Sequence, residues 1–148
     1  MPERRGFTLV EIMIVVAIIA LLAAISIPNL LRARLQSNES AVQGALQTIS
    51  AAEITYRSAN VQYGTLAQLS GASPAYIDTV LGTGTKSGYT IAVIDVDVDQ
   101  FAATAVPVTA GLTGVRSFCV SEDGVIRVQA AGGAIADRAA CIALTPTS

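Results

Sequence analysis

Residues 5–16 read Arg-Gly-Phe-Thr-Leu-Val-Glu-Ile-Met-Ile-Val-Val, a basic start followed by an apolar run that contains one acidic residue. The run continues to Leu31, and 20 of the 25 residues from 7 to 31 are apolar. Because a helix needs about 20 residues to cross a hydrocarbon layer of about 30 Å, this segment is long enough to span a membrane. The sequence therefore predicts one apolar helix joined to one small domain.

The composition of the 148 residues excludes several classes of function. The chain has no His, so a His-based catalytic triad and a His-ligated metal site are impossible. Its 9 basic and 11 acidic residues give a net charge of −2. After Ser58 there are only four basic residues against seven acidic ones. Since nucleic-acid binding needs clustered Lys and Arg, we expect no nucleic-acid partner.

Two ordinary interpretations fit the apolar segment by composition alone. A secretory signal peptide would be cut near Ala23, Ala24 or Ser26, and a simple anchor would stay in the membrane. Glu11 disfavours both interpretations. A carboxylate at mid-membrane costs about 2.5–3.5 kcal/mol, so such a group usually has a partner and a function.

The segment closely resembles the class III signal of type IV pilins and pseudopilins over residues 1 to about 35. The resemblance rests on the residues Arg4, Arg5, Gly6, Phe7, Glu11 and Pro28. It implies that a membrane-embedded prepilin peptidase cuts between Gly6 and Phe7 and then methylates the new amine of Phe7. The leader (residues 1–6) would be lost and the helix (residues 7–31) would be retained.

The resemblance also implies roles for two residues inside the helix. Glu11 lies one helical turn after Phe7, and it would match the amine of a neighbouring subunit and so set the register between subunits. Thr8 is a candidate to add a hydrogen bond there. Pro28 would kink the helix, since proline removes a backbone hydrogen bond. We hypothesise that part of the stretch 20–28 loses its helicity in an assembled filament.

An amphipathic helix is predicted to continue over residues 32–58. Its apolar stripe recurs every seven residues, at Leu35, Val42, Ile49 and Tyr56. Polar residues, among them Glu39 and Ser50, are expected mostly off that stripe. We expect the stripe to pack on a sheet, with a free coiled coil as the alternative.

The remaining residues, 59–148, are predicted to form a globular headgroup. A turn-rich loop with short helical turns at 65–69 and 75–81 leads into strands at 89–98, 101–106, 116–121 and 125–129. The fold class is therefore α+β, with the long helix packed on a four-stranded antiparallel sheet as in pilins.

Three alternating acidic residues, Asp95, Asp97 and Asp99, are expected to share one face of the first strand. A solvated strand edge explains them, and calcium binding is the alternative because carboxylates suit that ion. An EF-hand loop is excluded, since Gln100 and Val106 stand where Gly and Glu are needed. We therefore predict no cofactor, with calcium as a weak alternative.

Cys119 and Cys141 are the only cysteines. In a protein translocated outward such a pair predicts a disulfide, here between the third strand and the C-terminal segment, with two free thiols as the alternative.

The predicted function is that of a structural subunit of a type IV pilus or pilus-like filament. The partners would be copies of itself, the prepilin peptidase and an inner-membrane assembly platform. The chain would lie first in the inner membrane and then in a periplasmic or extracellular filament. A type II secretion pseudopilin is the first alternative. An anchored or secreted enzyme, using Lys86 with a Ser or a dyad among the three Asp residues, is a distant one.

Overall fold

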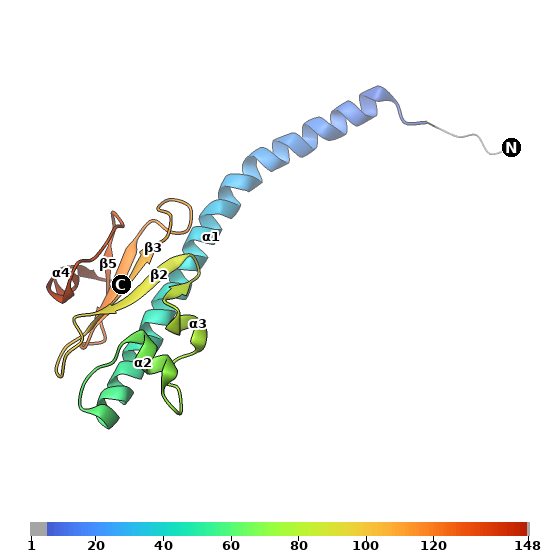
Figure 1. Cartoon of the computed structure of the whole chain (residues 1–148). Coiled ribbons are helices and arrows are strands. Elements are labelled where there is room, and N and C mark those ends of the chain that lie inside the picture. The colour runs from blue at the N-terminus through green and yellow to red at the C-terminus, as the bar shows by residue number, and fades with distance from the viewer. Residues whose placement is uncertain (1–5, 148) are drawn as a thin grey trace. The chain divides into compact units, whose positions relative to one another are not determined.

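The computed structural model describes residues 6–147, so Arg4 and Arg5 of the expected basic leader lie outside the described residues. Helix α1 runs without a break from Leu9 to Asn60 (Figure 1). Contacts between residues divide the chain into two units, Met1–Ala33 and Arg34–Ser148. The boundary falls inside α1, so one helix supplies the first unit and also the first element of the second.

The second unit contains a six-stranded sheet in which every strand is antiparallel to its neighbour and the strands follow chain order. The strands are β1 (Thr85–Lys86), β2 (Tyr89–Ile94), β3 (Ala102–Pro107), β4 (Ser117–Ser121), β5 (Ile126–Gln129) and β6 (Thr145–Pro146). The α+β class is confirmed, but the prediction of four strands is wrong. The two edge strands have only two residues each, too few to produce an alternating pattern.

Strand β2 is shorter than predicted, and this changes the interpretation of the three aspartates. The strand ends at Ile94, and Asp95 adopts a φ of 51°, which turns the backbone out of the extended conformation. Asp97 and Asp99 therefore lie in the loop between β2 and β3. The expectation that the three carboxylates share one strand face is wrong.

The main core lies between the C-terminal half of α1 and one face of the sheet. The apolar stripe of α1 packs there, as predicted, through Val42, Ala45, Leu46, Ile49 and Ala52. The sheet supplies Tyr89, Ile91, Phe118 and Val120, among others. This arrangement excludes the coiled coil for that half of the helix, because the stripe is already covered by its own sheet.

Two polar residues of α1 depart from the predicted pattern. Glu39 and Ser50 are buried, although the seven-residue stripe places them mostly elsewhere. The buried surface is wider than the stripe because the loop before β4 also covers the helix, where Val115 and Arg116 hydrogen-bond to Glu39.

Short helices close the edge of the main core. Helix α2 (Leu66–Gly71) begins with a capping box between Thr65 and Gln68, and α3 (Thr79–Gly82) is capped by Asp78. Both pieces lie beside the C-terminal end of α1 (Figure 1), and each buries one leucine in the core, Leu69 or Leu81.

A smaller core lies on the opposite face of the sheet. It contains Ala102, Cys119, Ile135 and Cys141. Helix α4 (Arg138–Ile142), capped by Asp137, carries Cys141 and was not predicted from the Gly- and Ala-rich sequence before it. The C-terminal segment is therefore a packed layer of the fold.

Candidate functional site

The N-terminal end of α1 is organised by Thr8 and Glu11. The backbone N of Thr8 donates to Glu11 Oε2 at 2.9 Å, and the Thr8 hydroxyl donates to the same oxygen at 2.7 Å. In return, the backbone N of Glu11 donates to Thr8 Oγ1 at 3.2 Å. This is a capping box, which satisfies backbone donors that a helix start otherwise leaves open. Glu11 is thus held by hydrogen bonds at the start of its own helix.

Gly6 and Phe7 precede this cap and are not helical. A Cβ added to Gly6 would have no atom within 4 Å, so the folded chain itself does not require a glycine there. The side chain of Phe7 is 82% exposed. Both residues are therefore accessible to another protein.

The surface of the first unit is apolar. Every large apolar side chain from Phe7 to Leu31 is between 44% and 82% exposed. Among the described residues, α1 is a helix long and apolar enough to cross a membrane. Because water is a poor solvent for such a surface, this part of α1 needs a membrane or other apolar helices around it.

Pro28 lies inside α1, and the helix continues through it. Since proline has no backbone N–H, the carbonyl of Ala24 lacks its usual helical partner at this point. The helix is intact here but locally weakened.

In the second unit, Glu39 ties α1 to the loop that precedes β4. Its Oε1 accepts from the backbone N atoms of Val115 and Arg116, each at 3.1 Å. Its Oε2 accepts from the Arg116 guanidinium at 2.9 and 2.6 Å. Burial by itself raises the pKa of Glu39, but the bonds from Arg116 and the two amides outweigh it and lower the pKa below the ordinary value.

Glu53 is a second buried carboxyl group on α1, with fewer partners. Its Oε2 accepts from the backbone N of Gly64 at 2.8 Å, while its Oε1 is buried without a hydrogen bond among the described residues. Burial raises the pKa of Glu53 to about 7, against a smaller lowering by the Gly64 bond. Sequence reasoning did not single out Glu53. Its position on the inner face of the helix was the signal that could have identified it as a buried carboxyl group.

The three aspartates of the β2–β3 region have three different partners. Asp99 pairs with Arg57 at 2.5 Å, Asp97 accepts from the backbone N of Val98 at 2.7 Å, and Asp95 accepts from the backbone N of Arg138 at 2.6 Å. Within residues 6–147, no three His, Cys, Asp or Glu side chains come together as metal ligands. The three carboxylates therefore have separate partners and are not gathered into one cluster.

The predicted disulfide is confirmed. Cys119 on β4 is bonded to Cys141 on α4, with their Cα atoms 6.0 Å apart. Both cysteines are fully buried, so the bond holds the C-terminal layer against the outer face of the sheet.

Comparison with known proteins agrees with this arrangement. The family model for the prokaryotic N-terminal methylation motif matches residues 1–27. The chain is 35% identical over 122 residues to the type IV major pilin protein PilA of Myxococcus xanthus, which covers 82% of this chain and 50% of that protein. It is 44% identical over 63 residues to the type IV wide pilus major component PilA4 of Thermus thermophilus, covering 43% of this chain and 48% of that protein.

A type II secretion protein is also similar. The type II secretion system core protein G of Klebsiella pneumoniae is 35% identical over 68 residues, covering 46% of this chain and 49% of that protein. The chain spans about half the length of the relatives it matches. The chain therefore carries the prokaryotic N-terminal methylation motif at the capped start of its exposed apolar helix, and it is similar both to type IV pilins and to a type II secretion core protein.

Proposed function

We propose that this chain is a structural, non-catalytic subunit that polymerises through its N-terminal helix into a type IV pilus. The observation that carries the proposal is the exposed apolar surface of residues 7–31, at the start of a helix that begins within the methylation motif. Once the helix leaves the acyl-chain layer of a membrane, only packing against other apolar helices keeps this surface from water, and this drives association with copies of the chain. The function needs no cofactor or metal ion.

Processing of the N-terminus is part of the proposal. A prepilin peptidase would cut between Gly6 and Phe7 and methylate the new amine of Phe7. The open space around Gly6 supports this, because the glycine serves an external cleft and not the fold. After the cut, Phe7 would carry a positive amine one turn from Glu11.

Glu11 would then set the register between subunits. Its carboxylate already accepts two bonds from Thr8, and a carboxylate has further lone pairs for an amine. In an apolar bundle of helices the attraction between the two charges is much stronger than in water. The axial position of each subunit would therefore be the one at which its amine meets the carboxylate of a neighbour. The inner membrane would hold the precursor, and an assembly platform in that membrane would extract it.

The intact mass of the protein isolated from its native cells tests the processing step. We expect the loss of residues 1–6 and the gain of one methyl group. A matched Gly6→Ile variant should keep the full leader, since a branched side chain cannot enter a cleft that accepts glycine. Cleavage near Ala24 would instead identify an ordinary secreted protein and overturn the proposal.

A short periplasmic pseudopilus of a type II secretion system is the second candidate. The similarity to core protein G favours it specifically. Electron microscopy of fibres sheared from the cell surface distinguishes the two. Long surface fibres composed of this chain indicate a pilus, and their absence together with a secretion defect in the deletion strain indicates a pseudopilus.

A further inference from the structure

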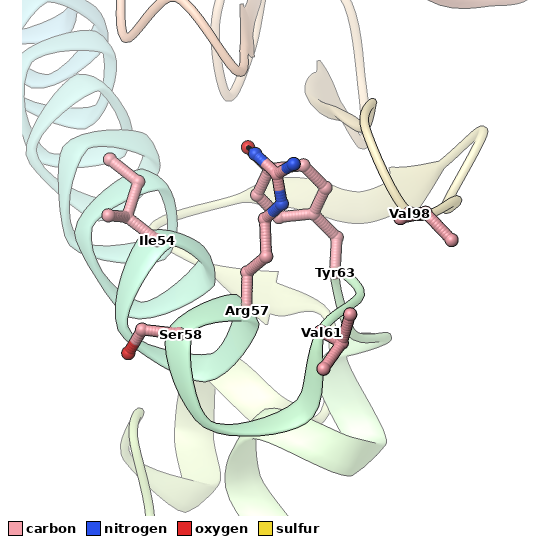
Figure 2. Close-up of a pocket in the computed structure, with 6 residues that line it drawn as sticks. All are labelled: Ile54, Arg57, Ser58, Val61, Tyr63 and Val98. Atoms are coloured by element: carbon pink, nitrogen blue, oxygen red, sulfur yellow. Dashed lines mark hydrogen bonds between the residues drawn. The ribbon is translucent and has the colours of Figure 1, made fainter.

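The loop between β2 and β3 forms one end of the headgroup together with the C-terminal end of α1. Tyr63, just after α1, donates its backbone N to the Asp97 carbonyl at 3.2 Å. A shallow pocket of about 460 Å³ opens here, lined by Ile54, Arg57, Ser58, Val61, Tyr63 and Val98. Figure 2 shows Arg57 lying beside the Tyr63 ring, with the guanidinium carbon 5.0 Å from the ring centre. Ile54, Val61 and Val98 remain 46–75% exposed.

An exposed apolar loop lies at the other end of the headgroup. Val108, Leu112 and Val115, in the loop between β3 and β4, are 47–59% exposed. This loop is docked on α1, since Asn38 Nδ2 donates to the Thr113 carbonyl at 2.9 Å. Arg57 follows Asn38 by 19 positions along α1, which is about 28 Å at 1.5 Å per residue. The apolar loop and the pocket are therefore at opposite ends of the same unit.

The two ends carry opposite charge. The pocket end carries the acidic residues Asp95, Asp97, Asp99, Glu122 and Asp123 against the three basic residues Arg57, Arg127 and Arg138, so it is acidic on balance. The other end carries the basic residues Arg34, Lys86 and Arg116, and Glu39 pairs with Arg116 there, so this end is basic on balance. Arg34 lies one helical turn before Asn38. Lys86 pairs in register with Tyr89, which pairs with Pro107 at the base of the apolar loop.

We propose that the pocket receives the apolar loop of a second copy of this chain, so that headgroups stack head to tail. Each copy offers both surfaces, and a contact between different surfaces of identical chains propagates into an open helical array. The opposite charges at the two ends orient the approach and disfavour contacts between like ends. The inference rests on the proposed self-assembly and adds the surface through which headgroups recognise each other.

Cysteine cross-linking in assembled filaments tests this contact. The native cysteines are joined to each other, so a Val98→Cys, Leu112→Cys double variant supplies the reactive thiols. The two positions lie at opposite ends of one chain, far beyond the Cα separation of about 7 Å that a disulfide spans, so any bond between them joins different copies. Under mild oxidation we expect the monomer band on a non-reducing gel to be replaced by a ladder of bands at multiples of the monomer mass. A reductant should restore the monomer band.

Three controls make the result specific. Each single variant should give at most a dimer. A Val98→Cys, Val125→Cys pair should give no ladder, because the β4–β5 turn that carries Val125 lies at the same end as Val98. A Leu112→Asp variant should lower the yield of filaments while the mass of the processed chain stays unchanged, since Leu112 is exposed and outside the core.

The outcomes separate this inference from the proposed function. Filaments of the double variant that form normally and give no ladder overturn the head-to-tail contact and leave the pilus function intact. A wild-type chain that forms no filaments at all overturns both. A ladder in the double variant that is absent from the controls supports the contact.

Discussion

The carboxyl group of Glu53 accepts one hydrogen bond, from the backbone N of Gly64 at 2.8 Å, and its second oxygen is buried without a partner. The group links α1 to the turn that follows it, and it does so inside the main core. Since no cation faces it among the described residues, the charged form is disfavoured there and the protonated form is stabilised.

Headgroup stability is therefore predicted to fall as pH rises through neutrality. The pKa of Glu53 is about 7 in the folded chain against 4.5 for the free group, so folding takes up a proton between these values. The stabilisation is complete below pH 4.5 and is lost as pH rises through 7. Between pH 5 and pH 8 we expect a loss of about 2.5 kcal/mol.

A Glu53→Gln variant is the matched control, because its amide oxygen can still accept from Gly64 but does not titrate. Denaturant unfolding of the detergent-solubilised chain at several pH values measures the effect. The difference in unfolding free energy between wild type and variant should change by about 2.5 kcal/mol over this range. A difference that is constant with pH contradicts the prediction.

The ion pair between Glu39 and Arg116 gives an asymmetric prediction. Glu39→Ala leaves two backbone amides and the guanidinium without their acceptor and should cost about 3 kcal/mol. Arg116→Ala should cost less, about 1 kcal/mol, because Glu39 keeps both backbone donors and Arg116 is half exposed. Equal losses in urea unfolding of the two variants would show that the side-chain pair, and not the backbone bonds, dominates this contact.

Glu39, the acidic member of this ion pair, gives the stability of the headgroup a pH dependence opposite in sign to that from Glu53. Because the pKa of Glu39 is lowered on folding, its contribution is present above the unfolded pKa of 4.5 and is lost as pH falls through the folded value. Glu39→Gln should therefore weaken the decline in stability at acidic pH, which the same unfolding series measures below pH 4.5.

The helix and the sheet could be predicted in good part because their signals are local. The apolar run, the seven-residue stripe from Leu35 to Tyr56 and the alternation in the four longer strands all follow from periods of 3.6 and 2 residues. The Thr8-x-x-Glu11 spacing before an apolar run is likewise a local capping signal.

The hydrogen-bond partners of the buried carboxyl groups could not be predicted in the same way. Glu39 is satisfied by Val115 and Arg116, which follow more than 70 residues later. The C-terminal end of β2 could not be predicted either. The alternation of apolar and polar residues continues through Val96 and Val98, although the backbone turns at Asp95. Both depend on tertiary contacts that a local pattern does not contain.

Loss of the disulfide should destabilise the headgroup without changing its main core. The bond closes a loop with a sequence separation of 22, for which the chain-entropy estimate is about 3 kcal/mol. A Cys119→Ala, Cys141→Ala double variant should show this loss in thermal or urea unfolding. Wild type in reductant should match it, and an unchanged midpoint would show that the small core around Ile135 holds the C-terminal layer alone.

The capping box and the charge of Glu11 can be tested separately. Glu11→Gln keeps an acceptor for Thr8 but removes the charge, so we expect normal cleavage and a large loss of filaments. Thr8→Val removes the cap, which costs about 1 kcal/mol of helix stability, and should reduce filament yield less. Thr8→Ser, which retains the hydroxyl, serves as the control. If Thr8→Val is as harmful as Glu11→Gln, the cap and not the charge is the essential feature.

Pro28 predicts a difference between the free chain and the filament. In the free chain the helix passes through Pro28, but the carbonyl of Ala24 has no helical donor and the preceding turn is weakened. In a filament, the stretch 20–28 is expected to lose helicity so that neighbouring helices can pack at their own register. Pro28→Ala restores the missing donor and should yield filaments with an unbroken helix, or fewer filaments. A reconstruction of wild-type filaments with a continuous helix through Pro28 would exclude this expectation.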